Sequence, residues 1–215
     1  MPAALLLTGV GRYADPWHPF ASTSAVLADA ASARGFDVTI ADDVDAAVAA
    51  LERGALPDLL LADLGKPVDG MPSPASPAGL ERVLSAVPVL ALHASANTFP
   101  DSEAWEAAIA GRWIDDVSWH PERGATRVSA TAAGRALGLV DFDTVDERYH
   151  RLRAGTARTV LLEVASEHGG TEPVAWLVEG HPRRAYCALG HDAEAYLAAP
   201  VPALLETLID SLKVR

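Results

Sequence analysis

The chain has 215 residues, of which 50% are hydrophobic and 21% charged, which excludes an intrinsically disordered chain. There are 17 Lys and Arg against 29 Asp and Glu, and the net charge of −12 argues against nucleic acid or an anionic membrane as the main partner. Cys187 is the only cysteine, which excludes an internal disulfide and a zinc site built from cysteines.

The apolar runs of the chain are short. The longest runs, such as those at 3–7 and 88–92, are far shorter than the roughly 20 residues that a membrane helix needs. No basic segment precedes the first run, so the pattern of a secretory signal is missing. We therefore expect a cytoplasmic protein whose partner is neither a membrane nor a nucleic acid.

Short apolar runs alternate with helical stretches through the first half of the chain. Strands are expected at 3–8, 36–40, 58–62 and 88–92, and helices at 20–33, 43–53 and 78–85. This alternation predicts a parallel sheet with helices on both faces. Ser22 or Thr23 is expected to cap the first helix, and Gly35 to end it.

The second half of the chain is richer in strands. After a helix at 101–110, strands are expected at 126–131, 158–164, 174–178 and 185–189, followed by an amphipathic helix at 201–212. Few helices separate these strands, so we expect them to extend the sheet antiparallel at one edge. Because no repeat or linker divides the chain, residues 1–215 are interpreted as a single α/β domain.

Unusual polar residues follow several predicted strands, and ligands of open α/β sheets bind at such strand ends. The candidate site residues are Trp17, His18, His93, Ser95, Asn97, His120, Asp146, Glu147, Tyr149 and His191. Only one of Asp146 and Glu147 is expected in the pocket, the other being solvated or paired with an arginine, because neighbouring side chains of an extended segment point to opposite sides. His150, His168 and His181 lie in polar stretches and are expected to be exposed.

Several short motifs occur in an order that resembles a known family. They are WHPF before a Ser/Thr-rich helix, LHASANTF after a buried strand, SWHP, DFDTVDERY, PVAW and LGHD with AY shortly after it. Together they span Trp17 to Tyr196 and resemble the ThuA-like (trehalose-utilisation) proteins, which carry a class I glutamine amidotransferase-like fold. The resemblance implies a flavodoxin-like three-layer sandwich, with a mainly parallel central sheet and an antiparallel edge, and a role in carbohydrate metabolism.

In the parent amidotransferases, a strand of the pattern PVLGIC.G ends at a nucleophilic cysteine. Here PVLALHAS places His93 at that position, and ALGH places His191 where the resemblance puts the catalytic histidine. Cys187 lies inside a predicted strand instead. The resemblance therefore implies a protein without glutaminase activity, and it predicts that His93 and His191 share one pocket, with His18 near them.

Three functions stay open on this evidence. The first is an enzyme that acts on a sugar or sugar-derived carbonyl compound, by proton transfer beside a carbonyl or by hydrolysis of a modified glycoside. Its candidate acids and bases are His18, His93, His120, His191, Asp146 and Glu147. Its candidate substrate contacts are Trp17, Ser95, Asn97 and Tyr149.

The second function is a metal-dependent hydrolase, and the third is a non-catalytic module that binds or senses a sugar. In the second, a divalent metal such as zinc would be held by His18, His93, His120 and His191, with Asp146 or Glu147. Against all three stands the interpretation of these histidines as ordinary structural residues. The expected partner is a small sugar-like molecule, and the oligomeric state stays open, a homo-oligomer included.

Overall fold

The computed structural model describes residues 1–198 and 200–213. The strands are β1 (Ala3–Thr8), β2 (Asp37–Ala41), β3 (Leu59–Asp63), β4 (Val89–Leu92), β5 (Gly124–Ala130), β6 (Phe142–Asp146), β7 (Arg158–Ala165), β8 (Thr171–Val178) and β9 (Arg184–Cys187). The α-helices are α1 (Phe20–Ala33), α2 (Val44–Ala50), α3 (Pro77–Ala86), α4 (Glu103–Ile109), α5 (Ala132–Ala136) and α6 (Pro200–Leu212). Short 3-10 helices are η1 (Gly11–Tyr13), η2 (His93–Ala96) and η3 (Ala193–Leu197).

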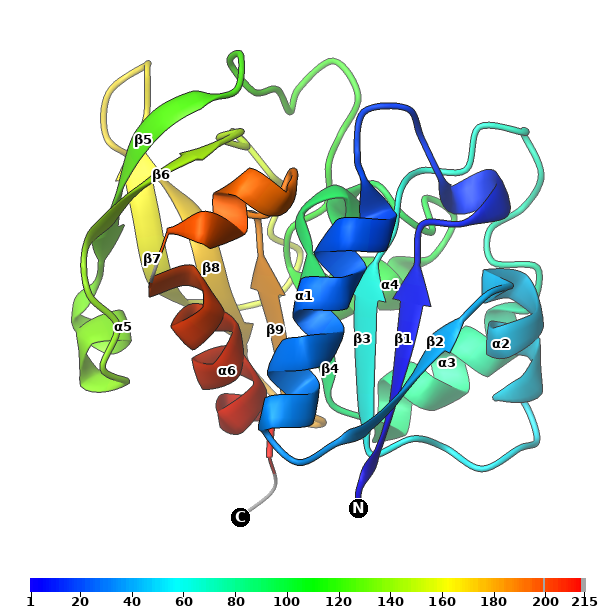
Figure 1. The fold of residues 1–215 in the computed structure, drawn as a ribbon. Helices are drawn as coiled ribbons and strands as arrows, with labels where there is room; N and C mark the ends of the chain where they lie inside the picture. The colour runs from blue at the N-terminus through cyan, green and yellow to red at the C-terminus, as the bar shows by residue number, and fades with distance from the viewer. Residues whose placement is uncertain (199, 214–215) are drawn as a thin grey trace.

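Within the described residues, nine strands form one sheet in the order β2-β1-β3-β4-β9-β8-β7-β5-β6 (Figure 1). The pairings from β2 to β9 are parallel, and those from β9 to β6 are antiparallel. Each part has four pairings, so the sheet is mixed rather than mainly parallel with an antiparallel edge. The predicted α/β class is confirmed, and the balance of parallel and antiparallel pairings is corrected.

The antiparallel part is larger than predicted because it includes β6, a strand that the sequence did not predict. The short helix α5 before it was not predicted either. β6 pairs with β5 over its whole length and alternates buried with more exposed residues. Its sequence, FDTVD, places polar residues at two of the three buried positions, so no apolar alternation marks it as a strand. Burial of Thr144 and Asp146 depends on partners that are remote in the sequence.

Helices pack on the sheet in two groups. In Figure 1, α1 and α6 lie against each other in front of the sheet, and α3 and α4 lie behind it. Gly35 follows the end of α1 with a φ of +89°, a conformation that glycine adopts without a steric penalty, and it ends this helix as predicted.

The start of α1 differs from the prediction. Pro19 occupies the N-cap position and no side chain caps the helix, so the expected cap at Ser22 or Thr23 is wrong. The physical reason is that Thr23 faces the sheet, where its hydroxyl and that of Ser24 donate hydrogen bonds to Asp63 (2.6 and 2.8 Å). The polar residues in the first turns of α1 therefore bind a buried carboxylate at the end of β3.

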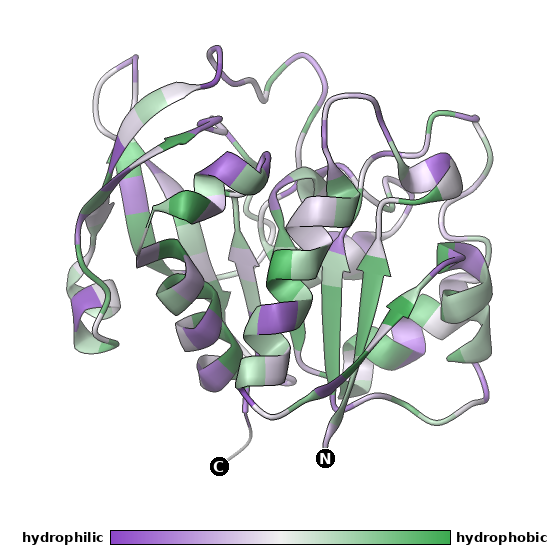
Figure 2. Ribbon diagram, in the orientation of Figure 1, coloured by the Kyte–Doolittle hydropathy of each residue, from purple (hydrophilic) through white to green (hydrophobic). Residues whose placement is uncertain are grey.

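The parallel strands form the apolar centre of the molecule. Leu6, Leu7, Leu60 and Leu61 are fully buried although they are consecutive in their strands, because helices cover both faces of the sheet. Figure 2 shows the same strands as the most hydrophobic part of the ribbon. Among the described residues, no helix combines the length and the hydrophobicity that crossing a membrane requires.

The carboxyl ends of β1, β3, β4 and β9 meet at the upper edge of the sheet in Figure 1. β6 lies at the far end of the strand order, but the antiparallel part curls over so that β6 approaches η3, which follows β9. The Thr144 hydroxyl of β6 donates a hydrogen bond to the Ala195 carbonyl of η3 (3.2 Å). The loops after β1, β4 and β9 therefore meet the end of β6.

His150 is buried, which corrects the expectation that it is exposed. Its ring stacks on Trp119 with 4.3 Å between centroids, and the backbones of the two residues exchange hydrogen bonds. The polar residues on either side of His150 in the sequence predict exposure, because the contact with Trp119 comes from a remote segment. His168 and His181 are exposed, as predicted.

Candidate functional site

His93 lies at the tight turn between β4 and η2. Its φ is 35°, which is rare for a residue with a side chain, and the Tyr186 hydroxyl holds the turn by donating to the His93 carbonyl (2.6 Å). The His93 ring is buried, and Nδ1 donates a hydrogen bond to the Ala188 carbonyl (2.6 Å). Nε2 of the neutral ring is then an acceptor, 2.9 Å from the Tyr149 hydroxyl.

Asp146 fixes the loop that carries His191. Its carboxylate is buried and accepts hydrogen bonds from the backbone N–H groups of Gly190 (2.7 Å), His191 (3.2 Å) and Glu147 (2.8 Å). Burial raises the pKa of Asp146, and these amides together with the charge of His93 lower it less, so the net pKa is raised. Asp146 is therefore neither solvated nor paired with an arginine, which corrects that part of the expectation.

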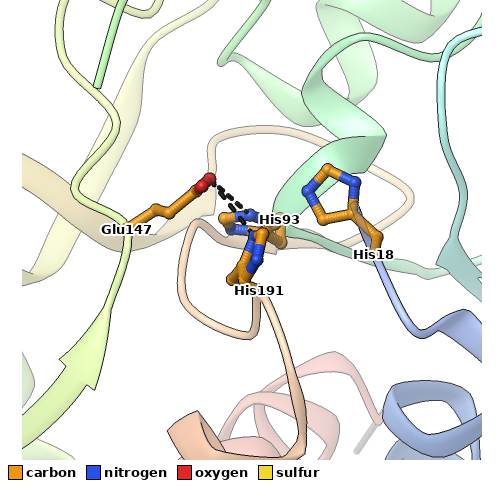
Figure 3. Close-up of side chains that lie close together, drawn as sticks. All are labelled: His18, His93, Glu147 and His191. Atoms are coloured by element: carbon orange, nitrogen blue, oxygen red, sulfur yellow. Dashed lines mark ion pairs between the residues drawn. The ribbon is translucent and has the colours of Figure 1, made fainter. Parts of the chain in front are cut away.

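Glu147 points toward His93 and His191 (Figure 3). Its Oε2 lies 3.4 Å from Nε2 of His93 and 3.3 Å from Nδ1 of His191, and its Oε1 lies 3.6 Å from Nδ1 of His120. Burial raises the pKa of this carboxyl, but the contacts with His191 and His93 outweigh burial, so the pKa lies well below its ordinary value. Glu147 is therefore a carboxylate at neutral pH.

His18 reaches the same centre from the loop after β1. Its Nδ1 lies 2.8 Å from both carboxylate oxygens of Asp15, which also accepts the backbone N–H of His18. The other ring nitrogen, Nε2, is buried and has no hydrogen-bond partner among the described residues. The ring centroid of His18 lies 5.1 Å from that of His93 and 4.8 Å from that of His191.

The pKa values of His18 and His93 are shifted in opposite directions. Burial lowers the pKa of His18, and the neighbouring His93 and His191 lower it further, so the net pKa is lowered in spite of Asp15. Burial also lowers the pKa of His93, but Glu147, Asp146 and the Ala188 carbonyl raise it more, so the net pKa is raised. The pKa of His93 therefore lies above that of His18, so His93 keeps its second proton to a higher pH.

A cavity of about 400 Å³ opens above this cluster. Seven of the ten predicted site residues line it: Trp17, His18, Asn97, His120, Glu147, Tyr149 and His191. His93 lies beneath its floor in contact with Tyr149 and Glu147, and its ring centroid is 5.5 Å from that of His191. The structure therefore brings His93 and His191 together, whereas their chemical roles stay predictions.

Ser95 lies away from the cavity. Its hydroxyl donates to the Ala62 carbonyl (3.1 Å) and accepts from the Leu64 N–H (3.1 Å), and the side chain is fully buried. These bonds join η2 to the end of β3, so the geometry gives Ser95 a structural place rather than the expected contact with a substrate.

Two residues of the site were not singled out from the sequence. Trp113 lines the cavity, with ring centroids 5.0 Å from Tyr149 and 5.8 Å from His120. Asp15 binds His18, and its position three residues before that histidine is the signal that points to it. Trp113 gives no comparable signal, because its neighbours in the site come from other segments.

A second cavity, of about 440 Å³, lies near the amino ends of the parallel strands. It is lined mainly by apolar residues and proline, with Asp58 and Lys213 as its charged residues. Asp58 accepts the backbone N–H of Ala3 (2.7 Å), and no histidine lines this cavity. The cavity above the histidines is therefore the candidate site, because acid–base and ligand groups converge there.

Comparison with known proteins supports the fold rather than an activity. No protein-family model and no curated protein sequence matches the chain. A ThuA-like protein from Parabacteroides merdae superposes with a TM-score of 0.75 at 21% identity, covering 98% of this chain and 89% of its own. This chain has the fold of ThuA-like proteins. A second ThuA-like protein, from Bacteroides uniformis, gives a TM-score of 0.67 at 14% identity, covering 96% of this chain and 89% of its own.

The same fold extends to glutamine-hydrolysing domains. The glutaminase domain of Trypanosoma brucei CTPS superposes on this chain with a TM-score of 0.50 at 11% identity, covering 100% of this chain and 96% of its own. At such identities the likeness concerns the fold alone. The chemistry must therefore be argued from the residues of the cavity.

Proposed function

We propose that the chain is a member of the ThuA-like family, within the class I glutamine amidotransferase-like superfamily and with its three-layer organisation. In this proposal the cavity binds a small sugar or sugar-derived carbonyl compound and transfers protons on it. The net charge of −12 favours such a ligand over nucleic acid or an anionic membrane. The protein would act in the cytoplasm, in carbohydrate metabolism.

One observation carries this proposal: His18, His93, Glu147 and His191 converge from four separate segments on one cavity. Imidazole groups beside a fixed carboxylate are a usual means of proton transfer in enzymes. Of these four, His18, Glu147 and His191 line the cavity, so they are the groups that can exchange a proton with a ligand directly. His93 supports them from below, through Glu147 and the Tyr149 hydroxyl.

The cavity walls suit a hydroxylated ligand. Trp113 and Trp17 contribute indole rings to the lining, and Asn97 and His120 contribute hydrogen-bonding groups. Trp17 is 71% exposed, which places it at the mouth rather than the interior. A sugar presents apolar C–H faces and several hydroxyls, and this mixture of aromatic and polar walls matches both.

Cys187 supports the expected lack of glutaminase activity. The thiol is buried inside β9, and burial raises its pKa to about 12. A thiol in that environment is not a nucleophile at physiological pH. His93 stands at the turn after β4, where an amidotransferase would carry its cysteine, and an imidazole there cannot form the thioester of glutamine hydrolysis.

The proposal is tested by deuterium exchange. The protein is incubated in D₂O with a panel of aldoses, ketoses and oxidised sugars, and exchange of the hydrogen beside each carbonyl is followed by NMR. We expect exchange with at least one compound, and a loss of about 10²- to 10⁴-fold in rate for Glu147→Gln. His168→Ala, an exposed histidine outside the cavity, is the matched control. Ligand binding without exchange or turnover would instead support the non-catalytic sensing module.

A further inference from the structure

We propose that His18, His93, His191 and Glu147 form a binding site for one divalent transition-metal ion, of which zinc is the representative. Each residue offers one ligand atom, and these atoms lie within 4.8 Å of one another. The site lies at the floor of the cavity that His18, His191 and Glu147 line, so its catalytic meaning rests on the proposed function. Metal binding itself can be measured without any substrate.

The spacing of the ligand atoms fits a tetrahedral ion. Zinc–nitrogen and zinc–oxygen bonds of about 2.0–2.2 Å at tetrahedral angles place neighbouring ligand atoms roughly 3.3–3.6 Å apart. Oε2 of Glu147 lies 3.4 Å from Nε2 of His93 and 3.3 Å from Nδ1 of His191. Two edges of the coordination tetrahedron therefore already have the required length. The other ligand-atom distances are at most 4.8 Å, and those longer than a tetrahedral edge would shorten when the ion binds.

The outer hydrogen bonds of two histidines have the pattern of metal ligands. A zinc-bound imidazole usually donates its second ring N–H to a carboxylate or a backbone carbonyl, which fixes its tautomer and orientation. Nδ1 of His18 is held by Asp15, and Nδ1 of His93 by the Ala188 carbonyl. When these rings are neutral, as metal binding requires, each therefore leaves Nε2 unprotonated and free to bind a metal.

Two buried ring nitrogens point to a missing partner at the same place. Nε2 of His18 and Nδ1 of His191 are buried without a hydrogen bond among the described residues, and a buried polar atom without a partner costs stability. Nδ1 of His191 meets Glu147 only at ion-pair distance. A single ion at the centre would bind both nitrogens.

The donor set selects the class of metal and excludes one predicted ligand. Three imidazoles and one carboxylate suit zinc, cobalt or nickel, whereas magnesium and calcium prefer oxygen ligands throughout. His120 lies outside the set, because its Nδ1 contacts the Pro121 carbonyl (2.9 Å) and reaches only the outer oxygen of Glu147. Of the ligands expected from the sequence, the proposed set therefore keeps His18, His93, His191 and Glu147 and leaves out His120 and Asp146.

Tyr149 supplies an internal test, because its hydroxyl lies 2.9 Å from the His93 nitrogen that the metal would need. Tyr149→Phe removes this competitor and leaves all four ligands in place. We expect the variant to bind metal at least as tightly as the native chain. If the cluster served proton transfer alone, we would expect neither the native chain nor Tyr149→Phe to bind the metal.

The experiment is a titration of the metal-stripped full chain with Co²⁺, followed by visible absorption, and with Zn²⁺, followed by calorimetry. We expect one equivalent to bind. His18→Ala, His191→Ala and Glu147→Gln should each weaken binding by more than about 100-fold, and Asp15→Asn by about 10- to 100-fold. Circular dichroism of each metal-free variant establishes that it is folded. His120→Ala and His168→Ala are the controls and should bind as the native chain does.

The outcomes separate this site from the proposed function. Absence of a saturable equivalent, or equal losses in the His120→Ala and His168→Ala controls, would overturn the metal site. If sugar exchange proceeds in a chain that binds no metal, the metal site fails and the proposed function stands. If the four residues bind metal as described and no sugar is exchanged, the metal site stands and the proposed function fails.

Discussion

The parallel and antiparallel halves of the sheet contribute to the cavity in different ways. Strands β1, β4 and β9 of the parallel half end in loops that carry His18, His93 and His191, and parallel topology alone places such loops side by side. Glu147 and Tyr149 come from the antiparallel half, and they reach the histidines only because that half curls back over the sheet. Strand order thus supplies the imidazoles, and sheet curvature supplies the carboxylate and the phenol.

The largest expected effect tests whether the two halves fold as one unit. Leu90→Ala in β4 and Leu162→Ala in β7 each remove a fully buried side chain, one from each half. Each should lower the free energy of unfolding by about 3–5 kcal/mol, measured by urea titration. A single transition at a lower midpoint is expected for both variants. Two separate transitions in either variant would contradict the interpretation as one domain.

A pH-dependent prediction concerns Asp63 in the parallel half. Burial raises the pKa of this carboxyl to about 6, despite the hydrogen bonds from Thr23 and Ser24. The folded chain therefore holds this proton more tightly than the unfolded chain, so its contribution to stability is present below about pH 4 and is lost as the pH rises through about 6.

Asp63→Asn removes this titration while keeping an oxygen that accepts hydrogen bonds. At pH 8 the variant should be more stable than the native chain by up to about 3 kcal/mol, and the difference should vanish near pH 4. Urea unfolding at several pH values measures it. A variant that is less stable at pH 8 would show that the ionised carboxylate is stabilised by contacts that outweigh its burial.

A smaller effect is expected where the halves join. Asp146→Asn leaves one of the two carboxylate oxygens, and its amide group faces backbone N–H groups that need an acceptor. We expect a loss of about 1–2 kcal/mol in stability, measured by urea unfolding, together with displacement of the His191 loop, observed as shifted histidine NMR signals. Unchanged His191 signals would show that other contacts hold this loop.

The smallest effect on stability is expected for Tyr149→Phe. The variant loses one buried hydrogen bond to His93, which is worth about 1 kcal/mol, and it keeps the ring contacts with Trp113 and His120. The unfolding midpoint in urea measures this loss. A loss several times larger would show that the Tyr149 hydroxyl contributes more to joining the two halves than one hydrogen bond explains.

The same division explains what the sequence could predict. The strands and helices of the parallel half follow from local apolar runs such as Leu5–Leu6–Leu7, and the site histidines follow from their places after those runs. β6 escapes prediction because its buried residues Thr144 and Asp146 are polar. Their burial depends on the curl of the sheet, which no local pattern encodes.

Individual side chains show the same limit. Neither the contact of Thr23 with Asp63 nor that of His150 with Trp119 is visible in the sequence, because both join segments that are far apart in the chain. Asp15 is the exception, because it binds a histidine only three residues away. Glu147 could be named as one of two carboxylates, but only the fold decides that it, rather than Asp146, faces the cavity.

The central claim is that the two halves meet in one metal-binding site, and a crystal structure of the chain grown with Zn²⁺ tests it most directly. Anomalous scattering at the zinc edge should show one strong peak, about 2.0–2.2 Å from ligand atoms of His18, His93, His191 and Glu147. Peaks confined to surface histidines such as His168 or His181 would contradict the claim. So would a zinc ion held by the three histidines of the parallel half without Glu147.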